Sequence, residues 1–220
     1  MMYDQYAGAN VRAQQATLTG QVFGLLGFSL LFTMGGALVA PHLGPGAFIL
    51  SLVGSFGSLI ALWFLKDKSP INLGLFYLFS VAEGLLLGLL VESYLARGMG
   101  AVVVNAAGTT AALVLGLGAY AWTTKRDLSG MGGFLTMAVF GLIIAGVINI
   151  FVHSGPLSLL ISAATVIIFS GLLMYDMQRL RGAKGGTGDA IMFAIAIYLD
   201  IFNIFISLLQ ILGFLGGRDD

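Results

Sequence analysis

The sequence predicts an all-α membrane protein in which seven transmembrane helices form one bundle. Of its 220 residues, 58% are hydrophobic and only 9% are charged, and the mean hydropathy is +0.98. Soluble domains carry about 25% charged residues, so this composition indicates that most of the chain lies in lipid. The apolar stretches do not alternate with polar residues at every second position, which argues against a transmembrane β-barrel.

Seven stretches are long enough to cross the membrane, since a spanning helix needs about 20 mostly apolar residues. We expect the spans at residues 21–40, 47–65, 71–95, 101–122, 131–152, 157–177 and 190–216. Together they form a single transmembrane domain, residues 21–217, between a polar cytoplasmic N-terminal segment, residues 1–20, and a short tail, residues 218–220. The N-terminal segment lacks the basic and then apolar pattern of a signal peptide, so the first span is expected to be retained.

Basic residues in the connections predict the orientation of these spans. If the N terminus is cytoplasmic, seven spans place eight basic residues on the cytoplasmic side and leave only Arg97 and Arg218 outside. The eight are Arg12, Lys66, Lys68, Lys125, Arg126, Arg179, Arg181 and Lys184. This distribution agrees with the positive-inside rule and puts the C terminus outside. In a rival count, the last stretch is a re-entrant segment and the C terminus returns to the cytoplasm.

Several classes of function find no support in the sequence. The chain has no cysteine, so it has no disulfide, no thiolate metal site and no cysteine nucleophile. Its two histidines, His42 and His153, are expected in short external loops and show no HExxH or other paired-ligand spacing. The formal net charge is zero, which gives no reason to expect a nucleic-acid partner. We therefore predict no enzymatic activity and no resident cofactor.

Two aspartates, Asp176 and Asp200, lie inside the last two predicted spans. An ionised carboxylate near the centre of a bilayer costs roughly 2.5–3.5 kcal/mol, so such a residue usually faces a cavity, a partner or an ion. Both aspartates lie equally far from Gly188, in the Gly-rich turn of residues 181–189. An antiparallel hairpin folded there brings the two carboxyl groups to similar depth, where they can face each other.

Further polar residues recur at helical spacing beside the two aspartates. On the last span, one face carries Asp200, Asn203, Ser207 and Gln210. On the sixth span, one face carries Ser158, Ser162, Thr165 and Asp176. Such faces in apolar helices indicate a hydrated path or an interhelical hydrogen-bond seam.

The two aspartates are expected to share one proton, because two unit charges 4 Å apart repel by about 4 kcal/mol at an effective dielectric of about 20. Once both are ionised, their oxygens suit a hard cation such as Ca²⁺, or their repulsion parts the two helices. Glu83, at the centre of the third span, is expected to join them in a cavity open to the cytoplasm, and Asn203 is expected to line the ion path. A purely structural role, in which the carboxyl groups are interhelical hydrogen-bond partners, stays open.

The two aspartate segments resemble the motifs of a known family. The segment Tyr175-Asp176-Met177-Gln178 resembles the [FY]-D-T-Q motif, and residues 197–205, which contain Asp200, resemble the L-Y-L-D-x-x-N-x-F motif. Both motifs belong to the transmembrane Bax inhibitor motif family, whose founding member is Bax inhibitor 1. The chain length, the seven spans and the polar N terminus extend the resemblance over the whole sequence.

This resemblance implies a fold and a function. Family members form a bundle in which six helices surround a central seventh, and bacterial relatives resemble pH-sensitive calcium leak channels of the inner membrane. The family's aspartate pair falls on Asp176 and Asp200, which are then expected to form the pH sensor and a transient Ca²⁺ site. They would share a proton in the closed state and lose it on opening.

The sequence departs from the family pattern in three respects. Met177 stands where a threonine is usual after the first aspartate, and Leu89 follows Leu87-Gly88 where the pattern often has proline. The calcium-leaking relatives use an arginine of the second span as a gating partner, whereas residues 47–65 contain none.

The sequence therefore predicts a pH-sensitive calcium leak channel of the cell's inner (plasma) membrane, with the lipid bilayer and the calcium ion as its partners. The main alternative is a non-conducting regulator that binds a membrane protease or another membrane protein, since other family members resemble protease modulators. Such a regulator would use its basic loops or small residues such as Gly20 and Gly24, which let helices approach closely. A second alternative is a proton-coupled transporter of a small solute. The oligomeric state is left open.

Overall fold

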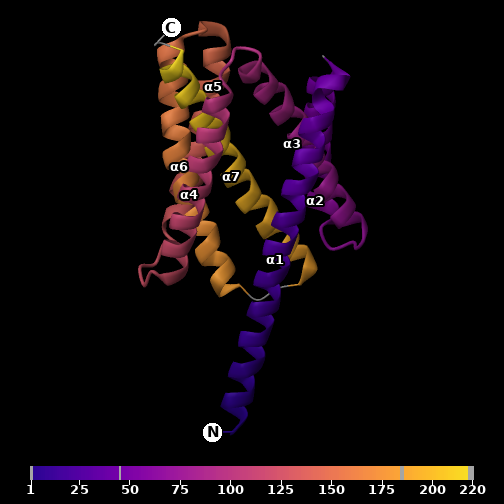
Figure 1. The fold of residues 1–220 in the computed structure, drawn as a ribbon. Helices are drawn as coiled ribbons and strands as arrows, with labels where there is room; N and C mark the ends of the chain where they lie inside the picture. The colour runs from indigo at the N-terminus through magenta and orange to yellow at the C-terminus, as the bar shows by residue number, and fades with distance from the viewer. Residues whose placement is uncertain (1, 45, 184–185, 218–220) are drawn as a thin grey trace. The chain divides into compact units, whose positions relative to one another are not determined.

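The computed structural model confirms the all-helical fold, with seven long helices (Figure 1). It describes residues 2–44, 46–183 and 186–217, and among these residues there is no strand. The helices are α1 (Met2–Leu43), α2 (Gly46–Leu65), α3 (Ile71–Leu95), α4 (Gly100–Thr123), α5 (Met131–Val152), α6 (Gly155–Gly182) and α7 (Thr187–Gly216). The helices at the second to fifth predicted spans begin and end within one residue of the prediction.

The other three helices extend beyond the predicted spans, because hydropathy locates the part of a helix that suits lipid and not its ends. α1 begins at Met2, although its stretch apolar enough to span the membrane begins at Gln15. It also includes His42 in its last turn, so the loop predicted for that residue is wrong. His153 does follow a helix, as the left-handed cap of α5 with φ 52°.

The connection between α6 and α7 is shorter than the predicted turn of residues 181–189. α6 continues to Gly182, so that Arg179 and Arg181 lie on the helix rather than in a loop. α7 begins at Thr187, which places Gly188 in its first turn. A methyl group at Gly188 would meet the Asp67 side chain and the Lys66 carbonyl oxygen, so the start of α7 lies against the connection between α2 and α3.

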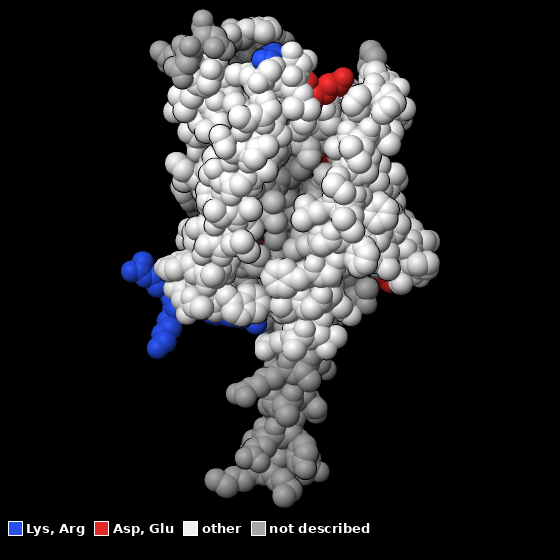
Figure 2. Space-filling view, viewed as in Figure 1, with Lys and Arg blue, Asp and Glu red and all other residues white. Residues whose placement is uncertain are grey.

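All seven helices are long and apolar enough to cross a membrane, which makes this a multi-pass membrane protein. Half of the spanning part of α7 is buried inside the molecule, a larger share than in any of the other spans. On the face drawn in Figure 2, charged atoms gather toward the ends of the helices, and the surface between them is almost entirely white.

The helices fall into two compact units. One contains α1, α2, α3 and residues 182–195, and the other contains α4, α5, α6 and the chain from residue 196 onward. α7 therefore contributes its first turns to one unit and the rest to the other. In the first unit α3 contacts both α1 and α2 extensively, whereas α1 and α2 barely contact each other.

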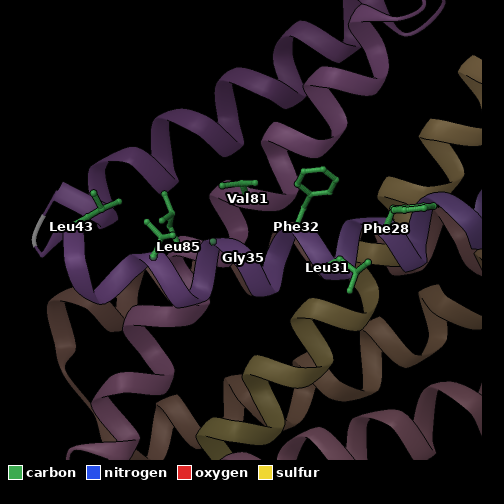
Figure 3. Close-up of a pocket in the computed structure, with 9 residues that line it drawn as sticks. Phe28, Leu31, Phe32, Gly35, Leu43, Val81 and Leu85 are labelled. Carbon is green, nitrogen blue, oxygen red and sulfur yellow. The ribbon is translucent and has the colours of Figure 1, made fainter.

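Glycines of α3 let it approach α1 closely. A methyl group at Gly84 would come within 2.8 Å of the Thr33 carbonyl carbon, and one at Gly88 within 2.7 Å of the Ala40 side chain. Small residues at such contacts matter in lipid, because lipid provides little hydrophobic drive for helices to pack against each other. Along the same two helices, an apolar groove of about 630 Å³ is lined by residues that include Phe28, Phe32 and Val81 (Figure 3).

We predict that Gly84→Ala lowers the free energy of unfolding by about 1–3 kcal/mol, because the added methyl group overlaps the α1 backbone. Thermal unfolding of the purified protein in detergent would measure the change. Gly74→Ala is the matched control, since it lies on the same helix with open space around it and alanine favours a helix by up to about 1 kcal/mol over glycine. Equal melting temperatures for the two variants would contradict the close contact.

Candidate functional site

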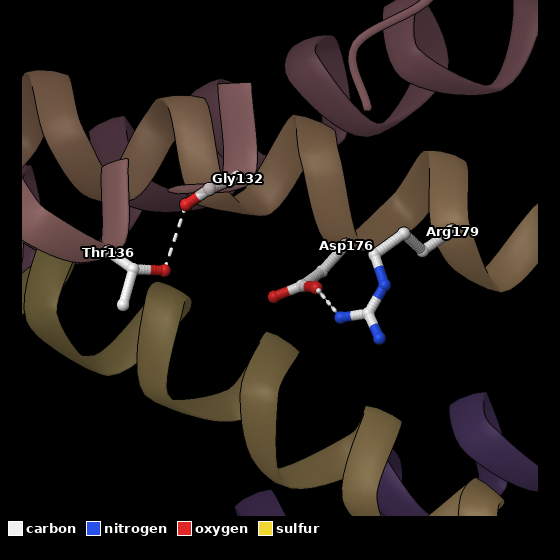
Figure 4. A network of polar contacts seen from close by, with 4 residues as sticks. All are labelled: Gly132, Thr136, Asp176 and Arg179. Carbon is white, nitrogen blue, oxygen red and sulfur yellow. Dashed lines mark hydrogen bonds and ion pairs between the residues drawn. The ribbon is translucent and has the colours of Figure 1, made fainter. Parts of the chain in front are cut away.

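Asp176 lies on the buried face of α6 and forms an ion pair one helical turn away. Its side chain is 9% exposed, and its Oδ1 accepts a hydrogen bond from the Arg179 guanidinium at 3.1 Å. Figure 4 shows the guanidinium folded back along α6 toward the carboxylate. The Arg179 guanidinium also lies 5.3 Å from the centre of the Tyr175 ring, within the range of a cation–π contact. Arg179 is itself 53% exposed, so the charged head stays at the surface while it binds the buried acid.

Asp200 is the more deeply buried of the two aspartates, with 3% of its surface exposed. Among the described residues, its Oδ2 atom has no hydrogen-bond partner. The charge of Asp176 acts on it, so the two carboxyl groups lie within electrostatic range of each other in the second unit. A buried polar atom without a partner is rare in folded proteins and calls for an explanation at this site.

A polar seam joins α6 to α7 beyond the two aspartates. The Ser162 hydroxyl donates to the Gln210 side-chain oxygen at 2.7 Å, which joins the polar faces predicted for the two helices. Thr165 of α6 and Ser207 of α7, which belong to the same polar faces, are buried. Ser158 is exposed. From residue 162 to 176 on α6 the seam covers about 21 Å of helix at ~1.5 Å per residue.

The other two predicted path residues have partners of their own. The Asn203 amide nitrogen donates to the Leu199 carbonyl oxygen at 2.8 Å, one turn earlier on α7. Glu83 lies in the first unit, where the Ser55 hydroxyl of α2 is its hydrogen-bond partner. That Glu83 converges with the aspartate pair stays a prediction.

The candidate site offers few ligands for a tightly bound metal ion. In the described part of the chain, no three Asp, Glu or His side chains come together where they can hold one. A cation at Asp176 and Asp200 would therefore need backbone carbonyl groups or water for most of its coordination shell.

Comparison with known proteins gives the family. The family model described as inhibitor of apoptosis-promoting Bax1 matches residues 15–217, nearly the whole chain. The protein belongs to the Bax inhibitor 1 family.

Curated relatives within this family come from bacteria and a virus. The modulator of FtsH protease YccA from Escherichia coli is 36% identical over 175 residues, which cover 80% of this chain and 78% of that protein. An uncharacterised protein of Pseudomonas aeruginosa is 34% identical over the full length of both chains. The Golgi anti-apoptotic protein of vaccinia virus is 33% identical, over 94% of this chain and 88% of that protein.

In this member of the Bax inhibitor 1 family, the glutamine of the first motif holds the connection between α4 and α5. The Gln178 side-chain oxygen accepts from the Leu128 N–H at 2.7 Å, and its amide nitrogen donates to the Arg126 carbonyl oxygen at 2.8 Å. One turn later, the Arg181 guanidinium donates to the carbonyl oxygens of Trp122 and Thr124. These bonds fix the end of α6 that carries Asp176 to residues 122–128.

Sequence reasoning missed this clamp, although Gln178 was already part of the motif. The signal was the position of Gln178 and Arg181 three residues apart on one helix, opposite a short polar connection. The connection also has internal structure, because the Ser129 N–H donates to Asp127 Oδ1 at 2.9 Å. Hydrogen bonds from the backbone and side chain of Ser129 lower the pKa of the exposed Asp127 carboxyl.

We predict that Gln178→Ala loosens the connection between α4 and α5, because the Leu128 N–H and the Arg126 carbonyl group both lose a partner. Each partner lost is worth about 1–3 kcal/mol where the group is buried. Hydrogen–deuterium exchange should show faster exchange across residues 126–130. Lys125→Ala, which alters an exposed residue of the same connection, should leave the exchange unchanged. Unaltered exchange in Gln178→Ala would mean that these bonds do not hold the connection.

Proposed function

We propose that this protein is a pH-sensitive calcium leak channel of the cell's inner membrane, gated by Asp176 and Asp200. The observation that carries the proposal is Asp200. Its Oδ2 is buried in a spanning helix without a hydrogen-bond partner in the described part of the chain, while the carboxyl group of Asp176 lies within electrostatic range. A single proton shared between the two groups accounts for this arrangement, because it removes one negative charge and supplies a hydrogen-bond donor.

Loss of the shared proton then opens the channel. Two ionised carboxylates in a low-dielectric site repel each other strongly, and the seam between α6 and α7 must either part or admit a cation. The oxygen ligands of the pair favour a hard cation such as Ca²⁺, bound briefly by Asp176 and Asp200. Asn203, one turn beyond Asp200, and Glu83, in the first unit, are the further residues that we assign to the ion path.

Arg179 takes the place of the gating arginine that the second span lacks. Its guanidinium pairs with Asp176 at 3.1 Å and is also close to the ring of Tyr175, so two neighbouring residues one turn earlier on α6 hold it. Pairing with Arg179 favours the charge on Asp176 and leaves the proton for Asp200, which has no basic partner on its own stretch of α7 from residue 190 to Gly216.

We predict that calcium flux into dye-loaded proteoliposomes rises as pH increases from about 5 to about 9, because the aspartate pair loses its proton over this range. Asp176→Asn and Asp200→Asn should each flatten or shift the pH profile, since one carboxyl group alone shares no proton. Arg179→Gln should shift the profile to higher pH, because Asp176 loses the cation that favours its charge.

Asp127→Asn is the matched control for this experiment, because it removes a carboxyl group from the exposed connection of the same unit and should preserve the wild-type profile. Flux whose pH profile is the same in the wild type, Asp176→Asn and Asp200→Asn would falsify the gating mechanism. No flux above empty liposomes at any pH would favour the alternative below.

A non-conducting regulator is the second candidate, supported by the relative from Escherichia coli that is named a modulator of FtsH protease. The partner would be a membrane protease or another membrane protein. Gly20, Gly24 and Gly27 leave open space on one side of α1, where a helix of the partner can approach closely. A proton-coupled transporter would instead show proton movement that depends on its solute. We propose the same orientation for all three functions. The N terminus and the basic connections lie in the cytoplasm and the C terminus lies outside, as the positive-inside rule predicts.

For the regulator, we predict that a photo-crosslinker on α1 captures one membrane protein in cells and that Gly24→Ile abolishes the crosslink by blocking the approach of the partner helix. Gly57→Ile is the control, because Gly57 lies on α2 with similar open space. Mass spectrometry of the crosslinked product would identify the partner. A crosslink retained in both variants would contradict an interface at the α1 glycines.

A further inference from the structure

The buried face of α2 is unusually polar for a helix that crosses a membrane. Three serines lie on it at helical spacing, Ser51, Ser55 and Ser58, and all are at most 8% exposed. This face lies against α3, since a methyl group at Gly54 would come within 2.8 Å of the Ala82 side chain. The serines therefore line a seam between α2 and α3, within the first unit.

Glu83 of α3 lies on this seam beside Ser55, which is its hydrogen-bond partner. The α2 and α3 helices are antiparallel neighbours, because only residues 66–70 connect them. Side chains of a helix lean toward its N terminus. The Glu83 carboxyl group therefore leans toward the connected end of the seam, where Ser58 follows Ser55 by one turn.

Ser58 supplies the observation that points to a ligand. Its side chain is 2% exposed, and its hydroxyl has no hydrogen-bond partner among the described residues. Other buried hydroxyls of these helices bond to their own backbone: Ser51 to the Phe48 carbonyl oxygen at 2.8 Å and Ser80 to that of Phe76 at 2.9 Å. A buried hydroxyl that has no such bond, one turn along α2 from the serine that binds a carboxyl group, is suited to hold a water molecule between itself and that carboxyl group.

No cation is available to neutralise Glu83 from the spans around it. From residue 15 onward α1 has only His42, in its last turn, and α2 has no titratable residue. α3 adds Tyr77, whose ring stacks on Phe32 of α1 at 4.5 Å, and, near its C-terminal end, Tyr94 and the exposed Glu92. Among the side chains of this unit that the structure describes, the remaining charges lie at the ends of helices, in residues 66–68 and at Asp189 of α7. A proton is the ligand that neutralises a carboxyl group in such surroundings.

We propose that Glu83, Ser55 and Ser58 form a second proton-binding site, in which Glu83 carries the proton and a water molecule joins it to the Ser58 hydroxyl. The site deepens the role of Glu83 on the proposed ion path. It rests on the first unit alone and does not require that the aspartate pair gates a channel. Its ligands are a proton and water, whereas the aspartate pair also offers oxygens to a metal ion.

The test is infrared difference spectroscopy of the full-length protein in liposomes, in the Asp176→Asn/Asp200→Asn background. A protonated carboxyl group gives a C=O stretching band that shifts in D₂O, and this background removes the bands of the aspartate pair. We expect such a band at neutral pH, its loss in Glu83→Gln, and its displacement to higher frequency in Ser58→Ala, because the carboxyl group loses its bridging water. Glu92→Gln, which alters an exposed acid of the same helix, should leave the band in place.

A neutral-pH spectrum without this band, or a band that Glu83→Gln leaves intact, would overturn the assignment of the proton. A band that Ser58→Ala leaves at the parent frequency would overturn the role of Ser58 and the water. Ser58→Ala is a small substitution that keeps the helix, so the test does not depend on Glu83→Gln alone. The flux experiment reports on the aspartate pair in wild-type protein, so the two proposals can fail independently.

Discussion

The constraint on which the rest of the structure depends is the absence of water in the interior of the membrane. Every polar group in a span must find its partner within the protein or carry a high free-energy cost. The backbone meets this constraint by forming seven continuous helices. Most hydroxyl side chains meet it in the same way, by donating to a carbonyl oxygen three or four residues earlier, as Ser29, Thr33, Thr110 and Thr165 do.

Two buried atoms of the described residues do not meet this constraint, Ser58 Oγ and Asp200 Oδ2. The charge of Asp176 acts on Asp200 in one unit. In the other unit, Ser58 lies one turn along α2 from Ser55, the hydrogen-bond partner of Glu83. Chance defects in packing do not explain why each unit combines a buried polar atom that has no hydrogen-bond partner with a buried acid. A proton, with or without water, accounts for both places, because it converts a carboxylate into a group that donates as well as accepts.

The sequence was sufficient to predict the fold, because lipid selects one kind of element and hydropathy reveals its length. It predicted the middle spans to within one residue, and it predicted polar faces on α6 and α7 that Ser162 and Gln210 join. It could not predict the ends of α1 and α6, where polar residues continue a helix beyond the lipid. The bond from Arg179 to Asp176 and the clamp formed by Gln178 were also missed, because periodicity does not show which partner a long side chain chooses.

The clamp has a consequence for the proposed gating. Gln178 and Arg181 tie the end of α6 to the connection between α4 and α5, so three helices of the second unit share one anchored end. Asp176 is thereby carried by the fixed side of the seam. On the other side of the seam, Gln210 bonds α7 to α6. Gln210 lies further along α7 than Asn203, so this bond is distant from Asp200. In the proposed gating, repulsion between the two carboxylates therefore acts mainly on the Asp200 side, because the clamp holds α6, and α7 is the element that we expect to move.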